Sequence, residues 1–158
     1  MIRPATPDDV GAIVGLVHDL ATYERASGSV RLDVDLLRAA LFGERPAVFA
    51  HVVEEDGEVV GMAIWFLNFS TWTGRHGIYL EDLFVKPQAR GAGHGRALLV
   101  TLARLAVEAG YGRVEWSVLD WNQPAIGFYR SLGAEPMEEW TTFRLAGDAL
   151  AGLAGGPA

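Results

Sequence analysis

The sequence predicts an α/β domain in which helices pack against a sheet. Segments with apolar residues at helical spacing alternate with short apolar segments typical of strands. Two of these strands, 47–54 and 59–67, are joined across Asp56-Gly57, a dipeptide that favours tight hairpins. The chain has 158 residues and half of them are apolar, which is enough for one domain with its own core.

The first half of the chain is predicted to contain two helices and three strands. Thr6, followed by proline at the first helical position, predicts the start of a helix that lasts to about Tyr23. Asp33 can cap a second, short helix that Gly43 ends. The two hairpin strands come next, and a third strand of the same sheet is expected over 77–85.

The second half adds two helices and two strands. Apolar spacing predicts a helix over 93–109, a strand over 113–118, and a further helix that Pro124 opens. A last strand is expected near 141–145. We therefore expect a single domain over 1–147, followed by a low-complexity Gly/Ala-rich tail over 148–158 that frays or lacks regular structure.

Composition narrows the classes of function. A net charge of −7 argues against a general nucleic-acid binder and suits a cationic substrate, although solubility alone explains it equally well. No apolar run approaches the ~20 residues of a membrane span. The chain has no cysteine, its four histidines show no metal-ligand spacing, and Lys86 is its only lysine. We expect a cytoplasmic protein with no metal, nucleic-acid or membrane partner.

The segment 79–95, YLEDLFVKPQARGAGHG, carries the functional signal. Glu81 and Asp82 lie inside an apolar strand whose successive side chains point to opposite faces, so we expect at least one acid to be buried. Gly91, Gly93 and Gly95 then let backbone N–H groups approach an anion at a helix N-terminus. An acid beside a phosphate site suggests an enzyme with a phosphorylated cofactor.

Three nucleotide-type interpretations compete for the glycine loop. A P-loop needs Lys-Ser/Thr after its last glycine, and Gly95 is followed by Arg96. A dinucleotide-binding turn needs glycine in place of Arg96, although Glu115 lies where its ribose-binding acid belongs. The third pattern, R-x-x-G-x-G, is met by Arg90, Gly93 and Gly95.

On this third pattern the chain resembles the GNAT superfamily of N-acetyltransferases. The segments YLED at 79–82, DWNQ at 120–123 and FY at 128–129 are similar to its diamine branch, which includes spermidine/spermine and thialysine acetyltransferases. The similarity covers about 2–134. It implies the GNAT acyl-CoA N-acyltransferase fold, with a mixed, mostly antiparallel sheet flanked by helices. It also implies a homodimer, in which the last strand is a candidate for exchange between subunits.

The resemblance further implies direct transfer of an acetyl group from acetyl-CoA to a small primary amine, such as a diamine, polyamine or thialysine, within a ternary complex. Glu81 is the candidate base, acting through a water, and Tyr129 is the candidate acid that reprotonates the CoA thiolate. A structural strand acid and a core tyrosine are the alternative roles. Candidate acetyl-CoA contacts are Leu83, Phe84, Val85, Arg90, Gly91, Ala92, Gly93, His94, Gly95, Arg96, Asn122, Pro124 and Ala125.

Aromatic and acidic residues suit recognition of an amine, because a ring face and a carboxylate both stabilise a cation. The substrate-side candidates are Tyr23, Glu24, Trp72, Asp82, Glu115, Trp116, Ser117 and Glu139, with Glu138 as the alternative to Glu139. Core packing explains the two tryptophans about equally well, and helix capping explains Asn122 equally well. Two other functions stay open: acetylation of a protein or peptide, and a non-catalytic acyl-CoA-binding module.

Overall fold

The computed structural model describes residues 1–155, and the chain divides into two compact units, Met1–Leu119 and a second unit that begins at Asp120. The first unit contains a five-stranded sheet in the order β1-β2-β3-β4-β5. Strands β1 to β4 pair antiparallel, while β4 and β5 pair parallel. This confirms the expected mixed, mostly antiparallel sheet.

The strands are β1 (Ile2–Pro4), β2 (Phe49–Glu55), β3 (Glu58–Ser70), β4 (Arg75–Val85) and β5 (Val114–Trp116). The hairpin between β2 and β3 is confirmed, and Asp56 and Gly57 have φ values of 49° and 81°. Positive φ at both central residues gives the turn a twist that matches its flanking strands. Sequence reasoning missed β1, which is only three residues long, and β5 is shorter than the predicted 113–118.

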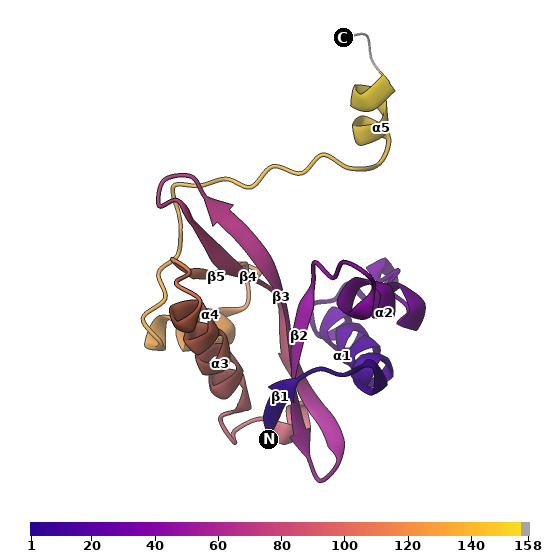
Figure 1. The fold of residues 1–158 in the computed structure, drawn as a ribbon, viewed down its shortest axis with the longest axis vertical. Helices are drawn as coiled ribbons and strands as arrows, with labels where there is room; N and C mark the ends of the chain where they lie inside the picture. Colours follow the sequence, from indigo (N-terminus) through magenta and orange to yellow (C-terminus); the bar gives the residue numbers. More distant parts are fainter. Residues whose placement is uncertain (156–158) are drawn as a thin grey trace. The chain divides into compact units, whose positions relative to one another are not determined.

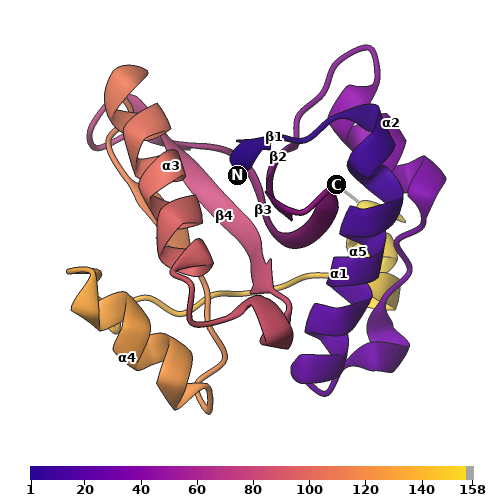
Figure 2. The same cartoon turned by 90° about the horizontal axis from the view of Figure 1, so that it is seen from below.

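Helices cover both faces of the sheet in the first unit. Helices α1 (Val10–Tyr23) and α2 (Val34–Phe42) lie on one face, and α3 (His94–Glu108) lies on the other (Figures 1 and 2). The predicted cap of α2 is confirmed, because the Asp33 side chain accepts a hydrogen bond from the Leu36 backbone N–H at 2.9 Å. None of the described helices is long and apolar enough to cross a membrane.

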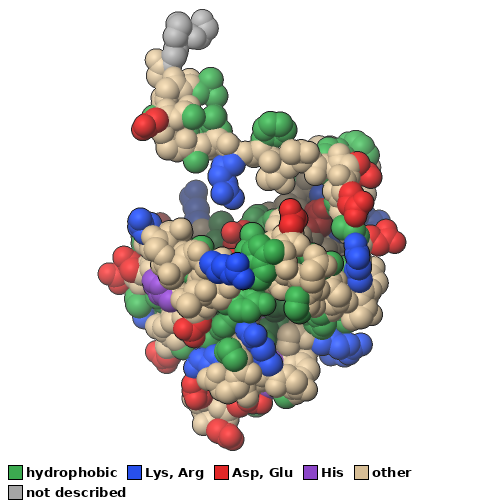
Figure 3. All heavy atoms as spheres, turned by 180° about the vertical axis from the view of Figure 1, so that it is seen from behind, with side chains coloured by type: hydrophobic (Ala, Val, Ile, Leu, Met, Phe, Trp, Pro, Cys, Tyr) green, Lys and Arg blue, Asp and Glu red, His purple; other side chains and the backbone are tan. Residues whose placement is uncertain are grey.

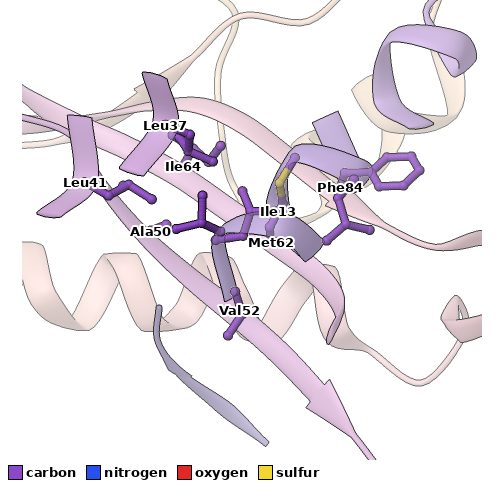
Figure 4. Close-up of a cluster of buried hydrophobic side chains, with 10 residues drawn as sticks. Ile13, Leu37, Leu41, Ala50, Val52, Met62, Ile64 and Phe84 are labelled. Carbon is purple, nitrogen blue, oxygen red and sulfur yellow. The ribbon is translucent and has the colours of Figure 1, made fainter. Parts of the chain in front are cut away.

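The core between α1, α2 and the sheet is built from alternate residues of the strands. Ile13 of α1 and Leu37 of α2 pack with Val52 and Met62 in a cluster of buried side chains (Figure 4). Phe84 of β4 belongs to the same cluster. The end of β4, where the candidate site begins, is therefore fixed by the main hydrophobic core.

The second unit corrects two predictions. It contains α4 (Gln123–Ser131), as expected after Asn122, and α5 (Gly147–Gly155). The tail expected to lack regular structure is thus helical up to Gly155, since alanine and leucine favour helix and Asp148 lies in the first turn; residues 156–158 lie outside the described part. The predicted last strand was wrong for this single chain, because residues 141–146 pair with no strand.

Candidate active site

A β-bulge places the two acids of β4 in different environments. Ile64 of β3 pairs with Asp82, whereas the next residue, Trp65, pairs with Leu80, so Glu81 is the extra residue. Glu81 is exposed, and Asp82 is partly buried. The expected burial of an acid is therefore partial, and Asp82 is the acid concerned.

Burial and neighbouring charge weaken the acidity of Asp82. Burial is the main cause that raises its pKa from 3.8 to about 6, and the charges of Glu81 and Glu24 add to it. Glu24 caps the C-terminus of α1, and burial raises its pKa as well. Three carboxylates from α1 and β4 therefore form one electronegative site, which would attract a cationic group.

The glycine loop leads from β4 to the N-terminus of α3. Gly91 and Gly93 have φ values of 90° and 83°, and Gly93 is the N-cap residue of α3. A Cβ atom built on Gly91, Gly93 or Gly95 would meet no heavy atom within 4 Å. The backbone here borders open space at a helix N-terminus, so the residues present fit a phosphate-bearing group such as the pyrophosphate of CoA.

The Arg90 side chain turns back from this loop. Its Nε donates a 2.9 Å hydrogen bond to the carbonyl oxygen of Val85. Its guanidinium lies 5.3 Å from the ring centre of Tyr23 and 5.5 Å from that of Phe84. Arg90 therefore joins the loop to α1 and β4 by cation–π contacts, and brings the candidate substrate residue Tyr23 beside the candidate cofactor loop.

The candidates Glu115, on β5, and Ser117, directly after it, contact neighbouring side chains. The carboxylate of Glu115 is 2.6 Å from Arg113 Nε and accepts a 3.1 Å hydrogen bond from Asn68. The Ser117 hydroxyl is 2.9 Å from the Tyr79 hydroxyl. Asn68 and Tyr79 were not among the sequence candidates, because their positions depend on strand register: Tyr79 pairs with Glu115, and Asn68 of β3 pairs with Gly77.

The two tryptophan candidates lie at different places along these strands and their turns. Trp116 pairs with Leu80, directly before the bulge. Trp72 is 87% exposed in the turn before β4. At about 3.3 Å per residue, the strand from Arg75 to Glu81 separates this turn from the bulge by roughly 20 Å, so the structure does not bring Trp72 to the carboxylates.

The remaining candidates belong to the second unit. The Asn122 side chain caps α4 by accepting a 3.3 Å hydrogen bond from the Ala125 backbone N–H, and Pro124 lies in the first turn. Tyr129 is on α4, with its ring centre 5.4 Å from that of Phe128. Glu139 lies in the irregular segment after this helix. The capping role of Asn122 is thus present, and the catalytic role of Tyr129 stays a prediction.

Charge is distributed without a dominant sign on the face drawn in Figure 3, where acidic and basic side chains are interspersed around apolar ones. Within residues 1–155, no group of three or more histidine, aspartate and glutamate residues could hold a metal ion.

Comparison with known proteins gives consistent matches. The model described as "Acetyltransferase (GNAT) family" matches residues 14–134. A thialysine N-epsilon-acetyltransferase of Bos taurus is 40% identical over 98% of this chain and 97% of that protein. L-ornithine N5-acetyltransferase NATA1 of Arabidopsis thaliana is 32% identical over 94% of this chain and 85% of that protein. Among solved structures, the V. cholerae integron cassette protein VCH_CASS6 matches with a TM-score of 0.84 and 28% identity, covering 99% of this chain and 98% of that one.

Proposed function

Because the chain belongs to the GNAT acetyltransferase family and is an N-acetyltransferase, we propose that it acetylates the side-chain amine of a small amino acid such as thialysine or ornithine, or one amine of a diamine or polyamine. The cluster of Glu24, Glu81 and Asp82 is the observation that carries this proposal, since carboxylates recognise an ammonium group. The relatives named for thialysine and for ornithine both act on amino acids with a primary amine in the side chain.

The loop amides at Gly91 and Gly93 and the N-terminus of α3 would hold the pyrophosphate of acetyl-CoA. Bound acetyl-CoA supplies an acetyl group activated as a thioester. The open space beside these glycines supports the assignment, because a side chain there would occupy the space of the ligand. Residues 83–85, which run into the loop, are the candidate contacts for the thioester end.

The amine must lose a proton before it can attack. An alkylammonium of pKa ~10.4 is only about one part in a thousand neutral near pH 7.4, a deficit of roughly 4 kcal/mol. We assign Glu81 as the base that takes this proton through a water, and Asp82 as the group that holds the cation beside it. The exposure of Glu81 supports access of that water.

The leaving thiolate then needs a proton. We assign this role to Tyr129, whose phenol proton would move to sulfur as the C–S bond breaks. Transfer from a phenol of pKa ~10 to a thiolate of pKa ~8.5 is uphill by ~2 kcal/mol, so it should be concerted with departure of the thiolate.

We also propose that the amine attacks acetyl-CoA directly in a ternary complex, and the absence of cysteine supports this. The chain has no cysteine that could carry an acetyl-cysteine intermediate. We also propose a cytoplasmic homodimer. The exposed side chains of Phe143 and Leu145 support the dimer, because a segment with large exposed apolar groups and no strand pairing suits burial against a second copy.

One substrate panel tests the proposal. Thialysine, ornithine, diamines, polyamines, aminoglycosides and peptides would each be assayed for acetyl-CoA-dependent release of CoA. We expect the highest kcat/KM for thialysine or ornithine, and a sedimentation mass of a dimer. Peptides as the best substrates would point instead to a protein acetyltransferase. Tight acetyl-CoA binding without acetylation of any amine would indicate a non-catalytic acyl-CoA-binding module.

A further inference from the structure

The tip of the β2–β3 hairpin is joined to both ends of the glycine loop. Glu58 forms an ion pair with Lys86 at 2.5 Å, directly before the loop. Glu55 Oε1 lies 2.7 Å from Nε2 of the His94 imidazole, at hydrogen-bond distance, directly after the loop. We call these two side-chain contacts, Glu58–Lys86 and Glu55–His94, the hairpin brace. It spans the segment 86–94, which contains every positive-φ glycine of the candidate cofactor site.

Each end of the segment is also held by regular structure. Lys86 extends the pairing of β4 by donating its backbone N–H to the Val60 carbonyl at 2.9 Å. His94 is the first residue of α3. The side chains of Lys86 and His94 are 22% and 16% exposed, so both are largely covered where they meet the hairpin. The brace therefore contacts the loop where it leaves β4 and where it enters α3.

The hairpin tip is short and its strands stay paired up to the turn, while the side chains of Glu58 and Glu55 are 67% and 42% exposed. The turn has only two residues, Asp56 and Gly57, and Glu55 and Glu58 pair directly across it. The loop, in contrast, contains glycines that have more conformational freedom to lose when a ligand orders them. Holding such a loop in its bound shape beforehand reduces the entropy lost on binding.

His94 was a candidate cofactor contact, and its side chain has another role in the structure. The imidazole Nε2 is engaged by Glu55, so this nitrogen faces the hairpin tip, while the backbone N–H of His94 lies at the N-terminus of α3. The brace also places two carboxylates near an anion site, and each is matched by a basic side chain. Removal of either basic partner would leave an uncompensated acid beside the proposed phosphate site.

We propose that the hairpin brace preorganises the acetyl-CoA loop, and that Lys86, His94 and their glutamate partners are positioning residues. The inference rests on the proposed function, because it takes the loop to be the acetyl-CoA site. A brace with this role changes acetyl-CoA affinity with little change in overall stability. A purely structural role would instead lower stability and all kinetic constants together.

The test compares E55Q, E58Q and the double variant with wild type, using the exposed Glu44→Gln as the matched control. Calorimetry should show acetyl-CoA binding weakened about two- to fivefold by each single change and about tenfold by both, in line with ion pairs near a surface. The KM of the amine should stay within twofold. Lys86→Met should weaken binding, while Lys86→Arg should keep it, because arginine keeps the charge.

Hydrogen–deuterium exchange of the free protein gives a readout that does not need the cofactor. Backbone amides of 86–94 should exchange faster in the double variant and unchanged in E44Q. Unchanged exchange together with unchanged acetyl-CoA affinity would overturn the proposed role of the brace. A variant with weaker acetyl-CoA binding, a higher amine KM and a lower melting temperature would also overturn it. If wild type itself fails to bind acetyl-CoA, the proposed function fails, and the exchange result alone decides the brace.

Discussion

Replacement of Asp82 by asparagine should make the protein more stable at pH 8 while lowering its activity. In the native state burial raises the pKa of Asp82 from 3.8 to about 6, and the charges of Glu81 and Glu24 add to the effect. The ionised carboxylate is therefore less favourable in the folded chain than in the unfolded chain. Asparagine is nearly isosteric and carries no charge, so D82N removes this penalty.

The magnitude follows from the size of the pKa change. At about 1.4 kcal/mol per pKa unit, the rise from 3.8 to about 6 corresponds to about 3 kcal/mol at pH 8, where Asp82 is ionised in both states. Between these two pKa values the native state binds more protons than the unfolded state, so wild-type stability falls as pH rises through this window. The gain from D82N should be about half as large at pH 5 and vanish below about pH 3.8.

Thermal unfolding followed by circular dichroism at pH 5 and pH 8 measures the effect. For a chain of this size, about 3 kcal/mol corresponds to an increase in melting temperature on the order of 6 to 12 °C at pH 8. Asp9→Asn is the control with the opposite sign. Arg3 binds Asp9 through two hydrogen bonds, of 2.7 and 2.9 Å, and lowers the pKa of that carboxyl to about 2.

D9N should lower stability by about 2 kcal/mol equally at pH 5 and pH 8, because the contribution of Asp9 is present above pH 3.8 and is lost only as pH falls through about 2. A D82N variant that is destabilised at pH 8, or equally stabilised at both pH values, would refute the reasoning. The first result would mean that the ionised Asp82 is not penalised in the native state, and the second that the stabilisation does not come from the titration of Asp82.

Three further perturbations address the site. Gly93→Val should weaken acetyl-CoA binding at least tenfold, about 1.4 kcal/mol, in calorimetry. The control is Gly110→Val, which also places valine at a positive φ but at the other end of α3. It should lower stability and leave acetyl-CoA binding intact. Glu81→Gln should lower kcat by roughly 10²–10⁴ with an unchanged acetyl-CoA dissociation constant; a wild-type kcat across the pH–rate profile would return Glu81 to a structural role. Glu24→Gln should raise the KM of the amine more than it lowers kcat, and the wild-type KM of the amine should rise with ionic strength; insensitivity to both changes would place the amine elsewhere.

The sequence was sufficient to predict most of the helices and the hairpin, because caps, turn residues and apolar spacing within each segment specify them. Apolar spacing, the Asp33 cap and Gly43 defined α2, and Asp56-Gly57 defined the hairpin, as the structure confirms. The glycine loop before α3 and the relation to GNAT acetyltransferases were likewise evident from residue types and spacing.

Strands whose pairing partners are distant in sequence could not be predicted from such local signals. The short strand β1 exists because it pairs with β2, about fifty residues later, and residues 141–146 remain unpaired because the single chain offers them no strand partner. Backbone hydrogen bonds in a sheet are made between segments, so β propensity alone does not decide whether a strand forms.

The sequence by itself determined that two acids and a glycine loop lie within one stretch of fifteen residues, together with the chemistry this combination favours. Only the tertiary structure decided which acid is withdrawn from solvent, because the bulge at Glu81 depends on the register between β3 and β4. It also decided that the Lys86 and His94 side chains contact the two glutamates of the hairpin tip. Burial and ion pairing are properties of contacts between distant segments, and those contacts exist only after the chain has folded.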